Sequence, residues 1–324
     1  IFSEGVTTIG DGPFRDCTSL TSLTFPESLT QIGGNAFRGC TALNSLTLPA
    51  KLTTVGGGAF QGCTGLTSVT FPEKLSSIGV SAFRECSGLT SLSVPDPVAS
   101  IADHAFRECS GLTEVTLGKA VTNIGSYAFS GCRKLKGLAI PKTLTTLGAG
   151  AFASCESLGE VAIPAGLTTA IYPSPTSSEG ANLSQFFGCS ALTKVTIGVP
   201  SITTVYTAWI DNENLKTTGI EEIIFSEGVT TIGDGSFRDC TSLTSLAFPE
   251  SLTHIGGNAF GNCTGLTEIA IPKGITSIAW NAFDGCIKLT NFKVAENNAT
   301  YSSKDGLLFN RPGTTLVKCP EGKS

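Results

Sequence analysis

The stretch "GGNAFRGCTALNSL" occupies residues 33–46, and three later stretches repeat its pattern. They are "GGGAFQGCTGLTSV" at 56–69, "GVSAFRECSGLTSL" at 79–92 and "DHAFRECSGLTEV" at 103–115. In each of them a Phe stands three residues before a Cys, and a Leu follows. A fixed period of roughly 20–29 residues with recurring Leu is typical of a solenoid, in which each unit buries its apolar face only by stacking on its neighbours.

The Phe and Cys positions recur at one constant interval along most of the chain, as from Phe14 to Phe37 to Phe60. Regular units fill residues 1–163 and again 223–294, while residues 164–222 keep the pattern but carry two insertions. In one irregular unit Trp209 and Asn212 take the two places. The pairs are Phe14/Cys17, Phe37/Cys40, Phe60/Cys63, Phe83/Cys86, Phe106/Cys109, Phe129/Cys132, Phe152/Cys155, Phe186/Cys189, Phe237/Cys240, Phe260/Cys263 and Phe283/Cys286.

The first part of each unit predicts a strand. In "LTSLTFP" (residues 20–26), Leu23 and Phe25 alternate with Ser and Thr, and a period of two places one face in the core. Pro26 has no N–H to donate to a sheet and ends the strand. The next piece, "SLTQIGG" (residues 28–34), predicts a short extended segment that directs its apolar residues inward.

The segment "GNAFRGC" (residues 34–40) predicts a short helical turn with Phe37 and Cys40 on one side, because residues three apart share a face of a helix. Stacked units then build one column of Phe and one column of Cys inside the solenoid. Cys acts in such a column as a small buried apolar residue. Asn212 fits the same place as another small side chain.

Two other roles for the cysteines agree less well with this spacing. A disulfide needs Cα atoms within about 7 Å of each other, whereas outer helical turns pack roughly 8–10 Å apart. A zinc site needs Cys or His ligands that are close in space, and the two histidines, His104 and His254, stand isolated. We therefore expect free, buried thiols from Cys17 to Cys286 and no bound metal.

The unit reads L-x-x-L-x-L-P-x-x-L-x-x-I-G-x-x-A-F-x-x-C and resembles the BspA-type leucine-rich repeat family. Members of that family are modular surface proteins of host-associated bacteria and of some parasitic protists. The resemblance extends over residues 1–163 and 223–294. It implies one leucine-rich repeat solenoid over residues 1–324, an α/β arc with a parallel sheet on the concave face and short helices on the convex face.

Residues 295–324 differ from the repeats and read as a hairpin-like terminal element. The stretch "YSSKDGLLFN" (residues 301–310) resembles an element that interrupts the array in the same family. Residues 307–309 and 316–318 are the expected strands, on either side of the turn-rich "NRPGTT". Both ends of the array are expected to lack caps, and the opening "IFSEGVTT" indicates a piece of a longer protein.

Several function classes are disfavoured by composition and motifs. The formal net charge of −5 provides no electrostatic basis for binding nucleic acid, and no run of eighteen apolar residues is present to span a membrane. No nucleotide-binding glycine motif and no convincing catalytic group occurs, so we expect no enzyme activity and no cofactor. The resemblance implies adhesion at the cell surface or outside the cell, with a host or matrix protein as partner.

The expected binding residues lie on the outward face of the strands and in the irregular middle. The two outward columns consist mainly of Ser, Thr and Ala, residue types that contribute little to binding hot spots. Larger or charged candidates within the chain are Glu114, Glu160, Lys194 and Glu222 in the strands, together with Tyr172 and Tyr206 in the irregular middle.

Two other interpretations of this surface stay open. A smooth Ser/Thr face also suits a structural surface-coat or antigen array that has no single ligand. A Thr ladder is also compatible with ice or carbohydrate lattices, although an arc is too curved for them. The Arg that often follows the Phe is usually succeeded by Asp or Glu, as at Arg15–Asp16 and Arg84–Glu85, which favours a solvated face of mixed charge.

Overall fold

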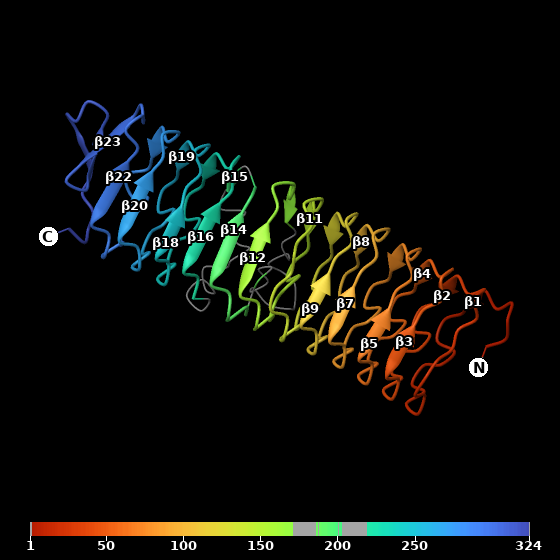
Figure 1. The fold of residues 1–324 in the computed structure, drawn as a ribbon. Helices are drawn as coiled ribbons and strands as arrows, with labels where there is room; N and C mark the ends of the chain where they lie inside the picture. The colour runs from red at the N-terminus through yellow and green to blue at the C-terminus, as the bar shows by residue number, and fades with distance from the viewer. Residues whose placement is uncertain (1, 171–185, 187, 200, 203–218, 324) are drawn as a thin grey trace, which may run out of the picture. The chain divides into compact units, whose positions relative to one another are not determined.

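The computed structural model describes residues 2–170, 186, 188–199, 201–202 and 219–323. They form two compact units, one of Ile1–Gly159 and Leu167–Ser190, the other of Glu160–Gly166 and Ala191–Ser324. In each unit successive coils of chain lie side by side, one coil per repeat (Figure 1). That residues 1–324 form one continuous solenoid stays a prediction.

Most coils contribute one strand of three or four residues whose side chains alternate between core and solvent. The alternation confirms the strand predicted from the Leu-rich part of the repeat, although the first coil forms no strand there and the coil around Leu138 forms only an isolated bridge to Val115. In the first unit these strands are β3 (Ser45–Thr47), β5 (Ser68–Thr70), β7 (Ser91–Ser93) and β9 (Glu114–Thr116). In the second unit they are β12 (Glu160–Ile163), β14 (Lys194–Ile197), β16 (Glu222–Phe225), β18 (Ser245–Ala247), β20 (Glu268–Ile271) and β22 (Asn291–Val294).

A second strand of two residues follows in most coils, in the segment predicted to be a short extended piece. Leu29 and Ile32 of the first such segment are fully buried, as expected. In the first unit these strands are β1 (Thr8–Ile9), β2 (Gln31–Ile32), β4 (Thr54–Val55), β6 (Ser77–Ile78), β8 (Ser100–Ile101), β10 (Asn123–Ile124), β11 (Thr146–Leu147) and β13 (Thr169–Ala170). In the second unit they are β15 (Ser201–Ile202), β17 (Thr231–Ile232), β19 (His254–Ile255) and β21 (Ser277–Ile278).

All pairing between coils is parallel and keeps the repeat register. Ser45 pairs with Ser68, one repeat later, and Thr54 pairs with Ser77 in the same way. In the second unit Lys194 of β14 pairs with Glu222 of β16 although an insertion separates them. The insertions therefore leave the stacking of equivalent residues intact.

The expectation of short helices is wrong, because the described residues contain no helix. The segment around Phe37 is a chain of turns in which Asn35 and Gly39 adopt left-handed conformations, with φ of 52° and 74°. The same pair of positions is left-handed at Ser81 (57°) and Glu85 (63°). A left-handed residue ends a helical run, and two of them four residues apart leave no room for an α-helix.

The hydrogen bonds of these turns run between coils instead of along a helix. Phe37 donates its backbone N–H to the carbonyl of Ala59 at 2.7 Å, and Gly39 donates to Gln61 at 2.8 Å. Phe14 donates to Ala36 at 2.9 Å in the same way. The turn segments thus form another ladder of backbone bonds along each stack.

The Phe side chains form stacked columns in the core. From Phe14 to Phe186 of the first unit, the centroids of neighbouring rings are 5.1 to 5.7 Å apart and their planes differ by at most 15°. Phe237, Phe260 and Phe283 continue the arrangement in the second unit. The rings lie closer together than the separation expected for packed helices, roughly 8–10 Å, because bonded turns approach each other more closely than helices do.

The Cys side chains form a second column beside the Phe rings. The Cys63 thiol donates to the Phe37 carbonyl of the preceding coil at 3.2 Å, and Cys109 does the same to Phe83 at 3.1 Å. All twelve cysteines are free thiols in the structure, and burial is confirmed for ten of them: Cys40, Cys63, Cys86, Cys109, Cys132, Cys155, Cys189, Cys240, Cys263 and Cys286. The prediction is wrong for Cys17, which is exposed because its coil has a neighbour on one side only.

The terminal element of the second unit is an antiparallel sheet of β23 (Tyr301–Lys304), β24 (Leu307–Asn310) and β25 (Leu316–Lys318). The two expected strands are confirmed as β24 and β25, and the sequence analysis missed β23. The expectation that this end of the array has no cap is wrong, because the element packs on the last coil. Asn298, only 1% exposed, donates to the carbonyls of Pro272 at 2.8 Å and Ile275 at 3.1 Å.

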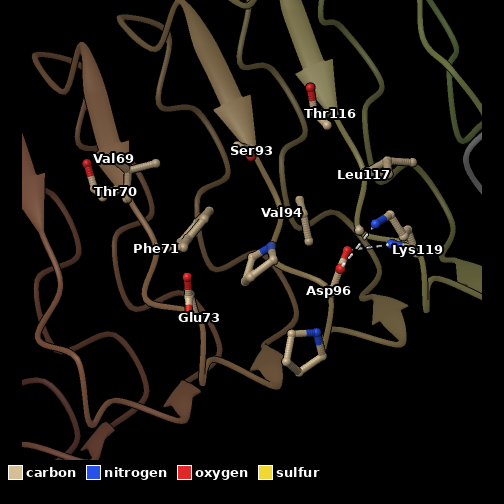
Figure 2. A pocket seen from close by; sticks show the side chains of 13 residues that line it. Val69, Thr70, Phe71, Glu73, Ser93, Val94, Asp96, Thr116, Leu117 and Lys119 are labelled. Atoms are coloured by element: carbon tan, nitrogen blue, oxygen red, sulfur yellow. Dashed lines mark hydrogen bonds and ion pairs between the residues drawn. The ribbon is translucent and has the colours of Figure 1, made fainter.

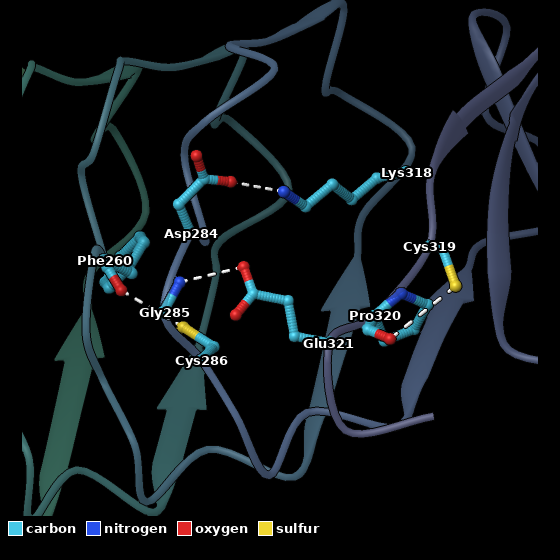
Figure 3. Close-up of polar contacts among 8 residues, drawn as sticks. All are labelled: Phe260, Asp284, Gly285, Cys286, Lys318, Cys319, Pro320 and Glu321. Carbon is cyan, nitrogen blue, oxygen red and sulfur yellow. Dashed lines mark hydrogen bonds and ion pairs between the residues drawn. The ribbon is translucent and has the colours of Figure 1, made fainter. Parts of the chain in front are cut away.

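Side chains of this element bond to groups of the coil beside it that, in other coils, bond to the next coil (Figure 3). Asn262 donates its N–H to the backbone carbonyl of Asp284, in the next coil, at 2.7 Å. The equivalent N–H, of Gly285, donates to Oε1 of Glu321 at 2.9 Å. Lys318 pairs with Asp284 beside it. A carboxylate and an ion pair thus satisfy groups at the edge of the stack.

We predict that Phe106→Ala lowers the free energy of unfolding by about 3–5 kcal/mol, the usual cost of truncating a buried Phe. Phe106 is fully buried between Phe83 at 5.6 Å and Phe129 at 5.5 Å. Chemical denaturation followed by circular dichroism measures the change. Phe14→Ala is the control and should cost less, since Phe14 is half-buried. Equal losses would contradict the assignment of the Phe column to the core.

We also predict that the stack loses stability in mild alkali. Burial raises the pKa of Cys63 from 9.0 to about 12. Its stabilising contribution is complete below pH 9 and falls as the pH rises from 9 toward 12, because only the unfolded chain releases the proton there. The loss is about 1.4 kcal/mol per pH unit for each buried thiol.

Urea unfolding between pH 8 and pH 10.5 tests this prediction. Cys63→Ala should show a shallower decline above pH 9 than the unchanged chain, because one titrating thiol has been removed. Cys17→Ala, which removes an exposed thiol, should decline as steeply as the unchanged chain. Identical slopes for both variants would show that the buried column does not titrate on unfolding.

Candidate binding surfaces

The outward columns of the strands are accessible, as the sequence analysis expected. None of their members is buried. In the first unit small hydroxyl side chains dominate, as at Ser45, Thr47, Ser68 and Thr70. The face is therefore polar, with little side-chain area for a partner to bury.

Another set of Thr hydroxyls, flanking the strands, is occupied by the fold itself. Thr53 donates its hydroxyl to the carbonyl of Thr30, 23 residues earlier, at 3.2 Å. Thr67 donates to Asn44 at 2.9 Å. These side chains reinforce the backbone ladder, so their abundance in the sequence has a structural cause.

The predicted charged residues fall into two groups. Glu160, Lys194 and Glu222 are register partners on β12, β14 and β16 of the second unit. The Lys194 ammonium lies 3.0 Å from the Glu222 carboxylate, and both side chains are more than one-third exposed. Such a surface pair contributes little stability. Glu114, exposed on β9, belongs to the first unit.

A second charged cluster in the same columns was missed by the sequence analysis. Lys293 lies 2.7 Å from Glu268 of the neighbouring coil, and Asn291 donates to the same carboxylate at 2.7 Å. Hydrogen bonds from Lys293 and then from Asn291 lower the pKa of Glu268. The sequence contained the information needed to find this cluster, because its three residues occupy outward strand positions of adjacent repeats.

A hollow in the first unit crosses the carboxyl ends of β5, β7 and β9 (Figure 2). Its volume is about 780 Å³, within the range of ligand sites. We call it the strand-end groove. It is lined by Val69, Thr70, Phe71, Glu73, Ser93, Val94, Pro95, Asp96, Pro97, Thr116, Leu117, Gly118 and Lys119.

The strand-end groove lies where the strand ladder is interrupted. β5 and β7 come from successive coils but belong to different sheets. Leu48 donates its N–H to Thr70 at 3.2 Å, and Val94 donates to Thr116 at 2.9 Å. Among the described residues, no equivalent bond runs from Phe71 to the next coil. The two coils therefore separate at their strand ends.

A departure from the repeat accompanies this break. The fourth coil reads "VPDPV" (residues 94–98), and Pro97 stands where the second and third coils have Lys51 and Lys74. A second proline removes a backbone donor and restricts the chain before it. Pro97 lines the groove, so this departure from the repeat is a feature of the groove that can be read in the sequence.

The Arg positions on the turn segments confirm the expected face of mixed charge. Arg84 lies 3.1 Å from Glu85, Arg15 3.4 Å from Asp16 and Arg238 3.9 Å from Asp239. The neighbouring acid balances each of these positive charges. The turn segments thus present no uniform basic stripe.

The two Tyr candidates of the irregular middle, Tyr172 and Tyr206, lie outside the described residues, as does Trp209. In the part of the chain that the structure describes, no three His, Cys, Asp or Glu side chains gather as metal ligands. Among those same residues no helix has the length and apolar character needed to cross a membrane.

Parallel coils with a period of 23 residues and a Leu-rich core define a leucine-rich repeat solenoid. The family model described as "BspA type Leucine rich repeat region (6 copies)" matches this chain over residues 1–92, 77–198 and 208–305. The chain belongs to the BspA-type leucine-rich repeat family.

Similar solved structures come from bacteria. A leucine-rich repeat protein of Bacteroides ovatus is 27% identical with a TM-score of 0.66, over 91% of this chain and 77% of that chain. A leucine rich cell surface protein of Faecalibacterium prausnitzii is 29% identical with a TM-score of 0.46, over 90% and 79%. No curated protein sequence matches the chain significantly.

Proposed function

We propose that this chain is a non-enzymatic binding module that acts at the cell surface or outside the cell and recognises a protein of a host or of an extracellular matrix. The observation that carries the proposal is the match to BspA-type repeats over residues 1–198 and 208–305. The BspA type is a family of bacterial surface proteins, which supports a location at the cell surface. The proposal needs neither cofactor nor catalytic residue.

The construction of the stack supports a binding role. Each coil is bonded to the next through strands and turns, so surface side chains are held on a stiff frame, and ordered frames reduce the entropy lost on binding. Loops held by such a frame often carry recognition. A long array also offers many equivalent places on which one exposed residue can change without disturbing the core.

The partner contact is proposed to include the irregular middle, residues 164–222, with Tyr172 and Tyr206 as anchors. Tyr buries a large area at low entropic cost, whereas Ser and Thr add little beyond complementarity. Glu160, Lys194 and Glu222, which are register partners on β12, β14 and β16, are proposed to contribute charge. Glu114 is proposed as a separate contact on the first unit.

The alternative function is a structural surface coat or antigen array with no single dedicated ligand. The uniform Ser, Thr and Ala columns favour it, because they provide no concentrated anchor. The two functions differ in what a deletion does. A dedicated contact is lost when one segment is removed, while a coat tolerates the removal.

Deletion of residues 171–184 tests the proposal against immobilised host matrix proteins, with binding measured by surface plasmon resonance. We expect the deletion to weaken binding at least about tenfold, since loss of anchor residues costs on the order of 1–2 kcal/mol or more. The comparison variant changes Thr24 and Thr47, outward residues that do not line the strand-end groove, to Lys, and should bind almost normally.

The reverse pattern would place the site on the strand face. If the deletion binds normally and the Lys variant does not, the outward Ser/Thr columns are the contact and the middle segment is dispensable. If neither the unchanged chain nor any variant binds a matrix protein, the coat alternative is favoured. Thermal unfolding of each variant checks that the stack is intact.

A further inference from the structure

We infer that the strand-end groove of the first unit binds an extended peptide segment that carries an aliphatic side chain next to a Lys or Arg. This inference rests on the proposed protein-binding function and deepens it by naming a site and the chemistry of its ligand. It depends on the apolar floor of the groove, on a backbone gap and on one unbalanced carboxylate.

The floor of the groove is apolar and partly accessible. Phe71, Val69 and Leu117 are each half-buried, whereas Leu48, which precedes Phe71 by one repeat, is only 4% exposed. Phe71 holds its position through an edge contact with Phe83, at 5.5 Å between centroids and 78° between planes. The exposed part of Phe71 and its aliphatic neighbours can therefore cover an aliphatic side chain.

The backbone gap supplies polar groups for a peptide main chain. In the neighbouring coils, Leu48 and Val94 each donate an N–H to the carbonyl of Thr70 or Thr116 in the next coil. By the same geometry, the Phe71 N–H and the Ser93 carbonyl face the gap between β5 and β7, where no bond between these described residues joins them. An extended segment that lies along the groove offers both a donor and an acceptor on its main chain for these groups.

The charges at the rim of the groove determine which residue of the bound peptide is favoured next to its aliphatic side chain. The Asp96 carboxylate accepts the Lys119 N–H at 2.9 Å, and the Lys119 ammonium lies 3.9 Å away. Within the described part of the chain, no ion pair or hydrogen bond reaches the exposed Glu73 carboxylate. Glu73 is therefore the unbalanced charge of the groove, and a basic side chain complements it.

A peptide fits this lining better than a sugar does. Glycan sites need several side-chain donors and acceptors aimed at hydroxyl groups, together with an open aromatic face. Here Phe71 is only half-buried, Pro95 and Pro97 line the groove beside aliphatic side chains, and its hydroxyls are limited to Thr70, Ser93 and Thr116. Figure 2 shows Val69, Val94 and Leu117 around the same hollow. This combination favours an extended polypeptide.

Fluorescence polarisation with three labelled synthetic peptides on a Gly-Ser background tests the inference on the whole chain. The first peptide carries a central Val-Leu-Lys, the second Val-Leu-Glu and the third Ser-Ser-Lys. We expect the first to bind at least about tenfold more tightly than Ser-Ser-Lys, which loses the aliphatic contact, and about two- to fivefold more tightly than Val-Leu-Glu, which loses an exposed ion pair.

Matched variants locate the binding. The sequence Phe-Pro-Glu occurs at residues 25–27 as well as 71–73, so Glu27→Lys is the control for Glu73→Lys. Glu73→Lys should weaken the first peptide about two- to fivefold and remove the preference over the second. Thr70→Trp should block the groove, while Thr24→Trp, at the same outward position of the first coil, should not.

The outcomes divide clearly. Equal binding of the three peptides, no binding of the first peptide, or equal effects of Glu73→Lys and Glu27→Lys would each overturn the inference. Binding of matrix proteins is measured in parallel with the same variants. If matrix binding survives while the peptide results are negative, the groove inference fails and the proposed function stands. If peptides bind in the groove but no matrix protein is captured, the proposed host partner fails.

Discussion

The backbone hydrogen bonds between successive coils are the constraint on which the rest of this structure depends. Each turn segment donates its N–H groups to the coil beside it, as Phe37 does to Ala59 at 2.7 Å, and bonded neighbours lie about 4.8 Å apart. Equivalent side chains are then forced into columns, so a column accepts only residues that can stack on themselves. Flat Phe rings and small Cys side chains meet this condition. The same bonds require left-handed residues in the turns, which explains why Gly, Asn and Asp recur there.

The distinctive surface features of the molecule lie where this regular bonding changes. Where the coils match, most outward residues are small, and some of the charged ones are paired, as at Lys194–Glu222 and Lys293–Glu268. Beside Phe71 the ladder opens, and the strand-end groove, which Pro97 also lines, lies there. At the last coil, Glu321 and Tyr301 accept backbone N–H groups that a further coil would otherwise engage. Covering such groups protects a sheet edge from pairing with other chains. Regular coils thus supply the frame, and the departures supply the specific surfaces.

The sequence predicted much of the inside and outside of the molecule from local periodicity. The constant repeat interval predicted stacked coils, the alternation at residues 20–26 and its repeats predicted which strand residues face solvent, and the buried Phe and Cys columns followed from the same interval. It did not distinguish a helix from a chain of turns at residues 34–40, because a spacing of three residues places Phe37 and Cys40 together in either. Bonds to the next coil decide that choice, and a local pattern does not contain them. Cys17 was assigned to the core for the same reason, since burial depends on a neighbour on both sides.

For the candidate binding surfaces, too, the sequence predicted one part and the tertiary structure decided the rest. The sequence by itself determined the repeat, the family and which charged residues, Glu114, Glu160, Lys194 and Glu222, point outward, since these follow from periodicity and composition. Only the tertiary structure decided that Lys194 and Glu222 neutralise each other, that the coils carrying Phe71 and Val94 separate, and that Glu73 retains an unbalanced charge. Each of these depends on distances between residues about one repeat or more apart. Such distances are set by the registration of whole coils, which backbone bonding and packing determine together and which no single repeat encodes.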